Sequence, residues 1–177
     1  MSAEGAKTIV AALLGAWLMG SLAIAFVATH NFRAVDRVLR GASDRPELST
    51  RLERLGATDA RMLLRHLASE MNRFYFRAWG WGQLVLALLV LVGLWGGGIP
   101  DRLVRGLVLT MLGIILVAAF YITPEVVAIG RRLDFAPRDP PPPDFARFWR
   151  LHTAYTLLDL AKLGIGVLAL IRLARPS

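Results

Sequence analysis

Charged residues are absent from three long apolar stretches of the chain. Residues 8–29, 78–95 and 106–123 contain no Asp, Glu, Lys or Arg. Each reaches the roughly 18 residues that a helix needs to cross about 30 Å of hydrocarbon. A fourth apolar stretch, residues 151–171, is equally long but carries one acidic and one basic residue. Because helices satisfy their own backbone hydrogen bonds in lipid, this pattern predicts four membrane-spanning helices.

The predicted fold class is therefore all-α, an integral membrane four-helix bundle with helical cytoplasmic extensions. We expect one membrane domain over residues 1–177, with spans at 8–29, 78–97, 105–123 and 151–171. The first stretch also contains Ala23-Ile24-Ala25, which has the composition of a signal-peptidase site. Its apolar run is longer than a signal core and its leader, MSAEGAK, is hardly basic, so a retained span is the favoured interpretation.

The connecting segments have helical patterns of their own. HNFRAVDRVLRG continues the first span to a stop at Gly41, and Pro46 opens a short amphipathic helix that ends before Gly56. A third helix is expected to begin near Thr58 and to run without a break into the second span, so that 30–77 forms a helical cytoplasmic loop. Residues 124–150 are predicted to form a proline-rich loop, in which PRDPPPP is a stiff extended linker.

The distribution of basic residues predicts the orientation. Four spans place both termini on one side, with five Lys and Arg residues, whereas the segments 30–77 and 124–150 on the other side carry ten and five. The positive-inside rule then places the large segments in the cytoplasm and both termini in the periplasm. Nineteen of the 21 basic residues are Arg, a usage typical of GC-rich bacterial genomes, so we expect a bacterial inner membrane.

Composition narrows the chemistry further. The chain has no cysteine, which excludes disulfides and thiolate metal sites. Its net charge of +8 is explained by basic residues beside the spans, so no nucleic-acid partner is expected. The bilayer itself is the predicted partner, with a membrane-protein partner or a homodimer as further options. No nucleophile elbow, phosphate loop or HExxH motif occurs, so no catalytic residue and no enzymatic activity is predicted.

The fourth apolar stretch contains Asp159 and Lys162, three residues apart. On insertion scales the two charges together cost about 5–7 kcal/mol, while the ten Leu, Ile and Val residues of this segment return about 3–6 kcal/mol. The segment therefore needs an offset, and a pair on one helix face provides it. We predict a polar intramembrane seam made of Asp159, Lys162 and Thr156, with Ser21 of the first span as a partner at similar depth.

Helical spacing indicates how this seam faces the rest of the bundle. His152, Thr156, Asp159, Lys162 and Gly166 follow the 3–4 spacing of one stripe. In the first span, small residues recur every four positions, which favours close helix packing; these are Ala12, Ala16 and Gly20. The stripe is expected to face that small-residue surface.

Two interpretations of the seam remain open. Intramembrane ionisable residues commonly serve proton or ion pathways. A neutralised pair that only fixes helix register is the structural alternative.

A second polar cluster is predicted at the cytoplasmic rim, where several spans begin or end. Its members are His30, Tyr121, Glu125 and His152. Two imidazoles and a carboxylate suit a divalent metal, and histidine also ligates haem. No tight ligand spacing is present, and rim His and Tyr residues are ordinary interfacial anchors. No cofactor is predicted, with haem or a divalent metal as the alternative.

Three segments carry a family resemblance: WLMGS in the first span, FYITPEVVAIGRRL leaving the third, and FARFWRLHTAYTLLDLAKL entering the fourth. They resemble the transmembrane protein 205-like family of small four-span membrane proteins, whose eukaryotic member is associated with cisplatin resistance. The markers are Tyr121 to Pro124 and Phe148 to His152. A more distant likeness is to four-span copper-resistance and protoporphyrinogen-oxidase membrane proteins, from which this chain departs because its first span lacks an internal His.

Three functional hypotheses follow. The first is a transport or resistance-related membrane protein that handles a proton or small solute at its polar seam. The second is a non-catalytic accessory subunit of a larger membrane complex. The third is a haem- or metal-handling membrane protein.

Overall fold

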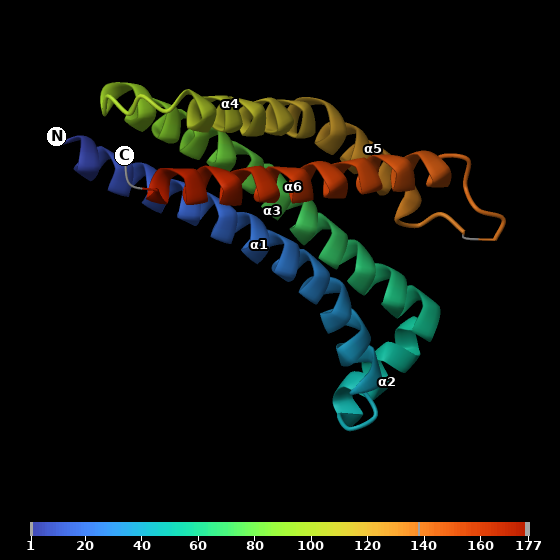
Figure 1. Cartoon of the computed structure of the whole chain (residues 1–177). Coiled ribbons are helices and arrows are strands. Elements are labelled where there is room, and N and C mark those ends of the chain that lie inside the picture. The colour runs from blue at the N-terminus through green and yellow to red at the C-terminus, as the bar shows by residue number, and fades with distance from the viewer. Residues whose placement is uncertain (1, 138, 176–177) are drawn as a thin grey trace.

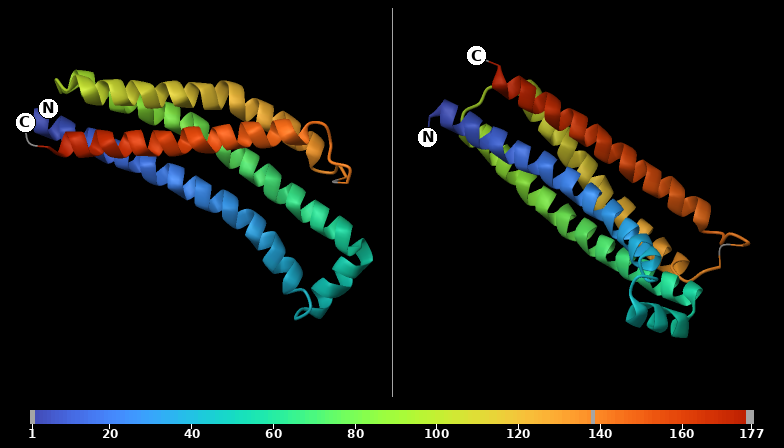
Figure 2. Two further views of the ribbon diagram at one scale, coloured as in Figure 1. Left: turned by 45° about the vertical axis from the view of Figure 1, so that its right-hand side comes forward. Right: turned by 90° about the horizontal axis from the view of Figure 1, so that it is seen from below.

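The computed structural model describes residues 2–137 and 139–175, and within these residues every regular element is a helix. The elements in chain order are α1 (Ala3–Arg40), α2 (Pro46–Leu55), α3 (Ala57–Gly96), α4 (Arg102–Val117), η1 (Ala118–Ile122), α5 (Thr123–Leu133) and α6 (Phe145–Ala174). Four long helical rods, α1, α3, α4–α5 and α6, lie side by side, and both termini are at the same end (Figures 1 and 2).

Helices α1 and α3 continue well past their apolar segments, as the sequence predicted. The Ser2 hydroxyl accepts a hydrogen bond from the Gly5 N–H and caps α1, which ends at Gly41. Helix α2 begins at Pro46, where the missing N–H leaves no helical bond unmade. At Gly56 the backbone has φ of 80°, a left-handed conformation that glycine adopts without strain, and this turns the chain into α3. Helix α3 therefore begins at Ala57, one residue before the predicted start at Thr58, and Gly56 is its N-cap residue.

Helices α4 and α5 form one rod with a widened turn between them. Asp101 caps α4 by accepting hydrogen bonds from the N–H groups of Leu103 and Val104. Residues Ala118–Ile122 form a π-helical turn directly before the Thr123-Pro124 pair. Proline has no N–H and its ring collides with the carbonyl four residues earlier, and a wider turn relieves both problems.

The proline-rich loop is shorter than the sequence predicted. Helix α5 extends to Leu133 and α6 begins at Phe145, so only the segment between them is irregular. The expectation of a loop over residues 124–150 is wrong at both ends, because Pro124 occupies a first-turn position of α5, where proline is tolerated. The predicted 137–143 linker includes Arg138, which lies outside the described residues.

Helices α1 and α3 share the most extensive helix–helix contact, and α6 lies against α1 and α4. Apolar side chains from all four rods form one core in the half of the molecule that contains the termini; its fully buried members include Val10, Leu14, Trp17, Val90, Leu94, Val108 and Met111. Beyond this core, α1 and α3 extend as a two-helix arm with α2 at its tip (Figure 1).

Three helical segments are long and apolar enough to cross a membrane: Ala3–Arg40, Ala57–Gly96 and Arg102–Leu133. Only 22–28% of the apolar window in each is buried inside the molecule, so most of this apolar surface faces outward. Exposed apolar surface on this scale is unusual for a protein surrounded by water. The fourth predicted span, residues 151–171, lies in α6 and is not among the three.

The small-residue face expected on α1 is corrected in part. Ala12 and Ala16 are exposed, whereas Gly20 packs against the ring of Trp79. The buried face of α1 is instead Ala6, Val10, Leu14, Trp17 and Ser21. The close contacts come from glycines on the other helix: a Cβ at Gly93 would lie 2.7 Å from Val10, and one at Gly97 would lie 2.3 Å from the Cβ of Ala6. The spacing of small residues in the sequence did not show which of the two helices provides the small residues at this contact.

We therefore expect Gly97→Ala to destabilise the α1–α3 contact by about 1–3 kcal/mol, as overpacking usually does. The added methyl group has no free space, because the carbonyl of Gly93 lies only 2.6 Å from its position. The measurement is the free energy of unfolding in detergent. Gly96→Ala is the matched control, since a Cβ there meets nothing within 4 Å. Equal stability of the two variants would contradict this packing.

Candidate functional site

The Lys162 side chain is buried among three helices. The residue is only 2% exposed, and its ammonium group donates hydrogen bonds to Asp159 Oδ1 on the same helix and to Gln83 Oε1 on α3. An ammonium group transferred from water to an apolar interior without partners is very unfavourable, so these two oxygens are what make the position tolerable. We call Lys162, Asp159, Gln83 and Trp17 the polar core cluster.

Trp17 joins this cluster to α1. Its indole Nε1–H donates a hydrogen bond of 3.1 Å to the same Gln83 Oε1 that accepts from Lys162. One amide oxygen therefore connects α1, α3 and α6. Ser21, the predicted partner of the charged pair, lies elsewhere: its hydroxyl accepts a 3.3 Å hydrogen bond from the indole of Trp79. The polar link from α6 to α1 passes through Gln83 and Trp17.

Asp159 differs from Lys162 in being partly open. Its side chain is 22% exposed against 3% for Lys162. Its Oδ1 binds the ammonium group, and within the described parts of the chain no group donates to Oδ2. Asp159 also lines a small cavity of about 20 Å³ together with Lys162, Gln83, Tyr155 and Thr123. A polar cavity of this size holds about one water molecule.

The π-helical turn forms one wall of this cavity. Ala118 and Ala119 of η1 line it, with Ile114 and Ile115 of α4 directly before them. A π turn inserts one residue into the helix and frequently marks functional positions. Small alanine side chains on a widened turn leave room next to Asp159.

The stripe predicted along α6 is rotated from its expected position. Lys162 and Gly166 are buried and Gly166 packs against Leu18 of α1, as the spacing indicated. Thr156 and His152 are exposed, and the Thr156 hydroxyl donates a 3.0 Å hydrogen bond to the His152 carbonyl of its own helix. Tyr155, one residue earlier than Thr156, takes the inward place and packs edge-on against Phe76.

The four residues predicted to form a rim cluster make separate contacts. His30 Nε2 lies 2.7 Å from Arg37 Nη2, and Glu125 accepts a 2.7 Å hydrogen bond from Arg147. The ring of His152 stacks on Phe148, and Tyr121 is 62% exposed. His30, Glu125 and His152 do not form a three-ligand group within the described residues. The expected ligand cluster is therefore not assembled, because His30, Glu125 and His152 each contact a different neighbouring side chain.

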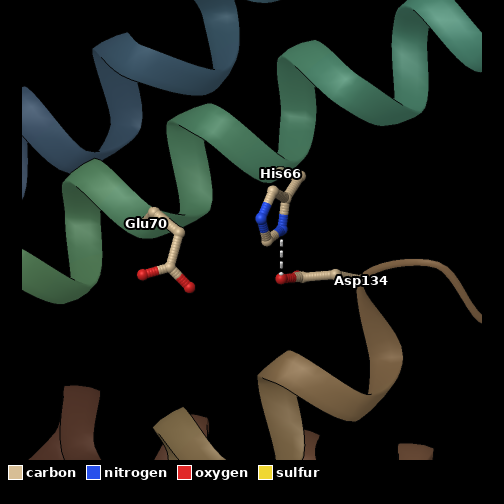
Figure 3. A group of neighbouring side chains, drawn as sticks. All are labelled: His66, Glu70 and Asp134. Atoms are coloured by element: carbon tan, nitrogen blue, oxygen red, sulfur yellow. Dashed lines mark hydrogen bonds and ion pairs between the residues drawn. The ribbon is translucent and has the colours of Figure 1, made fainter.

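A different group of titratable side chains joins α3 to the end of α5. His66 and Glu70 lie one turn apart on α3 and point toward Asp134, and the ligand atoms of all three lie within 4.8 Å of one another (Figure 3). His66 Nδ1 lies 2.8 Å from Asp134 Oδ2. His66 is half-buried, and its ring packs against Phe135.

Two arginines fill the space that a metal ion would need in this group. Arg73 donates to both Asp134 oxygens, at 2.8 and 2.9 Å, and to Glu70 Oε1 at 2.6 Å. Arg131 of α5 donates to both oxygens of Glu70. Two cations already balance two carboxylates, so a divalent ion would have to displace a bidentate arginine pair. The arrangement is an interhelical ion-pair network rather than a metal centre.

This network changes the acid–base properties of its members. Hydrogen bonds from Arg131 and Arg73 lower the pKa of Glu70 from 4.5 to about 2. For Arg73, partial burial works against the charged form, but the bonds to Asp134 and Glu70 outweigh it and raise its pKa. Both side chains of the Arg73–Asp134 pair are 10% exposed, so the pair is shielded from solvent and salt.

Two members of the polar core cluster were missed from the sequence, Gln83 and Trp17. Gln83 is the one amide side chain in the charge-free stretch 78–95, and a strongly polar residue in an apolar helix was a usable signal. Trp17 gave no such signal, since tryptophan is ordinary in apolar helices. The partner of a buried lysine is best sought among all polar residues of the other spans, not only those at a matching depth.

Comparison with family models, with curated proteins and with solved structures gives no match to this chain.

The lowered pKa of Glu70 leads to a pH prediction. Its folded-state pKa of about 2 lies below the ordinary value of 4.5, so the folded protein binds fewer protons in this range. The stabilising contribution is complete above pH 4.5 and is lost as the pH falls toward 2. Glu70→Gln should flatten the decline of the unfolding free energy across this window.

The control for this measurement is Glu53→Gln. Glu53 lies on α2 and accepts a hydrogen bond from Ser49, and no arginine in residues 2–137 and 139–175 pairs with it. If Glu70→Gln and Glu53→Gln follow the same pH profile as the unaltered protein, ionisation of Glu70 in the α3–α5 network does not stabilise the fold.

Proposed function

We propose that this chain is a four-span integral membrane protein of the transport type, in which the Asp159–Lys162 pair handles a proton inside the bilayer. The spans are α1, α3, α4–α5 and α6, arranged as a four-helix bundle with both termini periplasmic and the two-helix arm in the cytoplasm of a bacterial cell. The observation that carries the proposal is the Asp159 carboxylate, which among the described residues is partnered on one oxygen and which borders a water-sized cavity.

Membrane insertion is supported by the outward apolar surface. Three helices meet the length and hydropathy of a span while burying less than a third of their apolar windows. Hydrocarbon chains are the solvent that such surfaces require. Fifteen basic residues on the arm side against five on the terminal side support the orientation.

The inclusion of α6 as the fourth span is supported by the polar core cluster. Its 30 residues are close to the 32 of the α4–α5 rod, and the two charges within 151–171 are paired with each other. Pairing removes most of the insertion penalty that sets α6 apart from the other three helices. At 1.5 Å per residue, Asp159 lies roughly 12 Å from the cytoplasmic end of this span.

The chemistry of the cluster suits a proton better than a larger solute. A cavity of about 20 Å³ accommodates water and excludes organic molecules. A proton arriving through that water can bind the open oxygen of Asp159, and Gln83 Oε1 then remains as the acceptor that holds the Lys162 ammonium group. The resemblance to the transmembrane protein 205-like family, with its resistance-associated member, agrees with a transport role.

The orientation is tested by cysteine labelling, for which the cysteine-free chain needs no background changes. We expect Ser43→Cys, in the turn after α1, to react with an impermeant maleimide only after the cytoplasmic side is opened. Pro100→Ser is a matched non-reactive control, and Pro100→Cys in the α3–α4 turn should react from outside in intact cells, because Pro100 is exposed. Labelling of both cysteines from the same side would contradict the proposed four spans.

The proton function is tested in vesicles that contain a pH-sensitive dye. Under an imposed membrane potential, the unaltered protein should acidify the lumen faster than protein-free vesicles. Asp159→Asn alone fixes the cluster in a form that resembles protonated Asp159, with the ammonium charge unbalanced, so the decisive variant is D159N combined with Lys162→Met, which removes both charges. We expect this double variant to insert and fold but to lose the flux, reaching the level of protein-free vesicles.

The control for flux is Thr156→Ala, because Thr156 is exposed and bonds only to its own helix. An unaltered flux in the D159N, K162M double variant would make the pair a structural element. No flux from the unaltered protein would overturn the transport proposal and favour an accessory subunit.

A further inference from the structure

The end of the molecule that contains the termini has a cavity unlike the polar core cavity. Its volume is about 470 Å³, which lies in the range of small-molecule sites. Three segments form it: the start of α1, the α3–α4 turn with the start of α4, and the end of α6. Its lining includes four basic residues, Lys7, Arg102, Arg172 and Arg175. We call it the terminal basic pocket.

The pocket has a strong excess of positive charge. Asp101 is its one acidic lining residue, and both of its oxygens are already engaged. Oδ1 accepts from the N–H groups that begin α4, and Oδ2 accepts a 2.9 Å hydrogen bond from Arg172. Although partial burial opposes its ionisation, these bonds lower the pKa of Asp101 and keep it charged. It neutralises Arg172, and Lys7 is paired with Glu4 at 3.4 Å, so among the described residues Arg102 and Arg175 are the two cations of the lining that remain.

The remaining cations are available for a ligand. Arg102 and Arg175 have no ion pair within residues 2–137 and 139–175, and both are exposed. The floor of the pocket is apolar, with Ile99 1% and Leu173 7% exposed. A concave surface with cationic walls and an apolar floor concentrates positive potential and attracts anions. Guanidinium groups bind phosphate oxygens in a bidentate manner, as they also bind carboxylates.

The position of the pocket along the helices suggests where the phosphate comes from. Lys7 directly precedes the charge-free stretch 8–29, and Arg172 directly follows the apolar stretch 151–171. The pocket therefore lies at the level where the apolar segments end. Leu103, 53% exposed, provides an apolar edge beside the basic residues. An amphiphile with a phosphate headgroup and an apolar tail fits both features.

We propose that the terminal basic pocket binds a phosphate-type anion, with the headgroup of a membrane phospholipid as the principal source. The lipid source depends on the membrane placement proposed above, whereas the anion site depends only on the pocket itself. Basic residues also ring span ends as simple anchors. A binding site differs from a simple anchor because binding of the anion requires particular arginines, and variants of those arginines can be compared with variants of other arginines.

The test compares Arg102→Gln, Arg175→Gln as a double variant with a matched double variant at the other rim, Arg77→Gln, Arg150→Gln. Arg77 and Arg150 likewise have no ion pair within the described residues, so both pairs remove two positive charges. Because Arg102 and Arg175 lie on the side with fewer basic residues, their loss does not weaken the positive-inside bias. Lipids that stay bound after purification in mild detergent are counted by native mass spectrometry.

We expect the unaltered protein and the R77Q, R150Q variant to retain a phospholipid, and the R102Q, R175Q variant to bind it at least about tenfold more weakly. In a second arm, inorganic phosphate is titrated into delipidated protein and the thermal midpoint is followed. A midpoint that rises with phosphate only when Arg102 and Arg175 are present, without retained lipid, would assign a soluble phosphate compound as the source.

Equal retention by both double variants, or no response to either probe, would overturn the proposal. The proton-flux assay separates this outcome from failure of the proposed function. The R102Q, R175Q variant keeps the polar core cluster intact, so its flux is expected to equal that of the unaltered protein whatever its lipid binding shows.

Discussion

The Lys162 ammonium group is the constraint on which the arrangement of the helices depends. A charge that is 2% exposed must be matched by oxygen atoms at hydrogen-bond distance, and here Asp159 and Gln83 supply them. Gln83 belongs to α3 and also accepts from Trp17 of α1. The requirement of one cation therefore fixes the rotation of α6 against α3 and, through a shared amide oxygen, the rotation of α1. The apolar core alone would allow several rotations, because its side chains have no directional preference.

Beyond the end of the apolar core, neighbouring helices are joined by polar side-chain contacts. On the arm, Asn72 accepts a hydrogen bond from Asn31 at 2.7 Å and donates one to the Ala28 carbonyl at 3.0 Å. Further out, the Arg73–Asp134 pair holds α5 to α3. These bonds specify direction at positions where the surroundings change from apolar to aqueous. The arm can therefore remain ordered beyond the rods α4–α5 and α6, although it buries little apolar surface.

The sequence predicted most of the helices, but it did not predict the helical parts of 124–150 or the faces that the helices bury. Gly41, Pro46 and Gly56 marked the helix boundaries of the arm, because each has a distinct backbone preference. The face of α1 was predicted wrongly at Ala12 and Ala16, since the exposed side of this helix is apolar as well as its buried side. Hydrophobic periodicity then carries little information about rotation. For the same reason Tyr155 took the inward position expected of Thr156, and Gln83 was overlooked.

The unequal burial of the two charged residues bears on which of them exchanges a proton. Lys162 is more enclosed than Asp159, and both of its observed hydrogen bonds go to protein oxygens, although it borders the same cavity. Asp159 has an oxygen without a protein donor among the described residues and borders the cavity beside the π-helical turn. Hydration of the carboxylate lowers the desolvation cost of Asp159, so partial exposure by itself suits a structural pair as well as a functional one. The opening is on the carboxylate side, and under the proposed function Asp159 is therefore the group that exchanges a proton with the cavity.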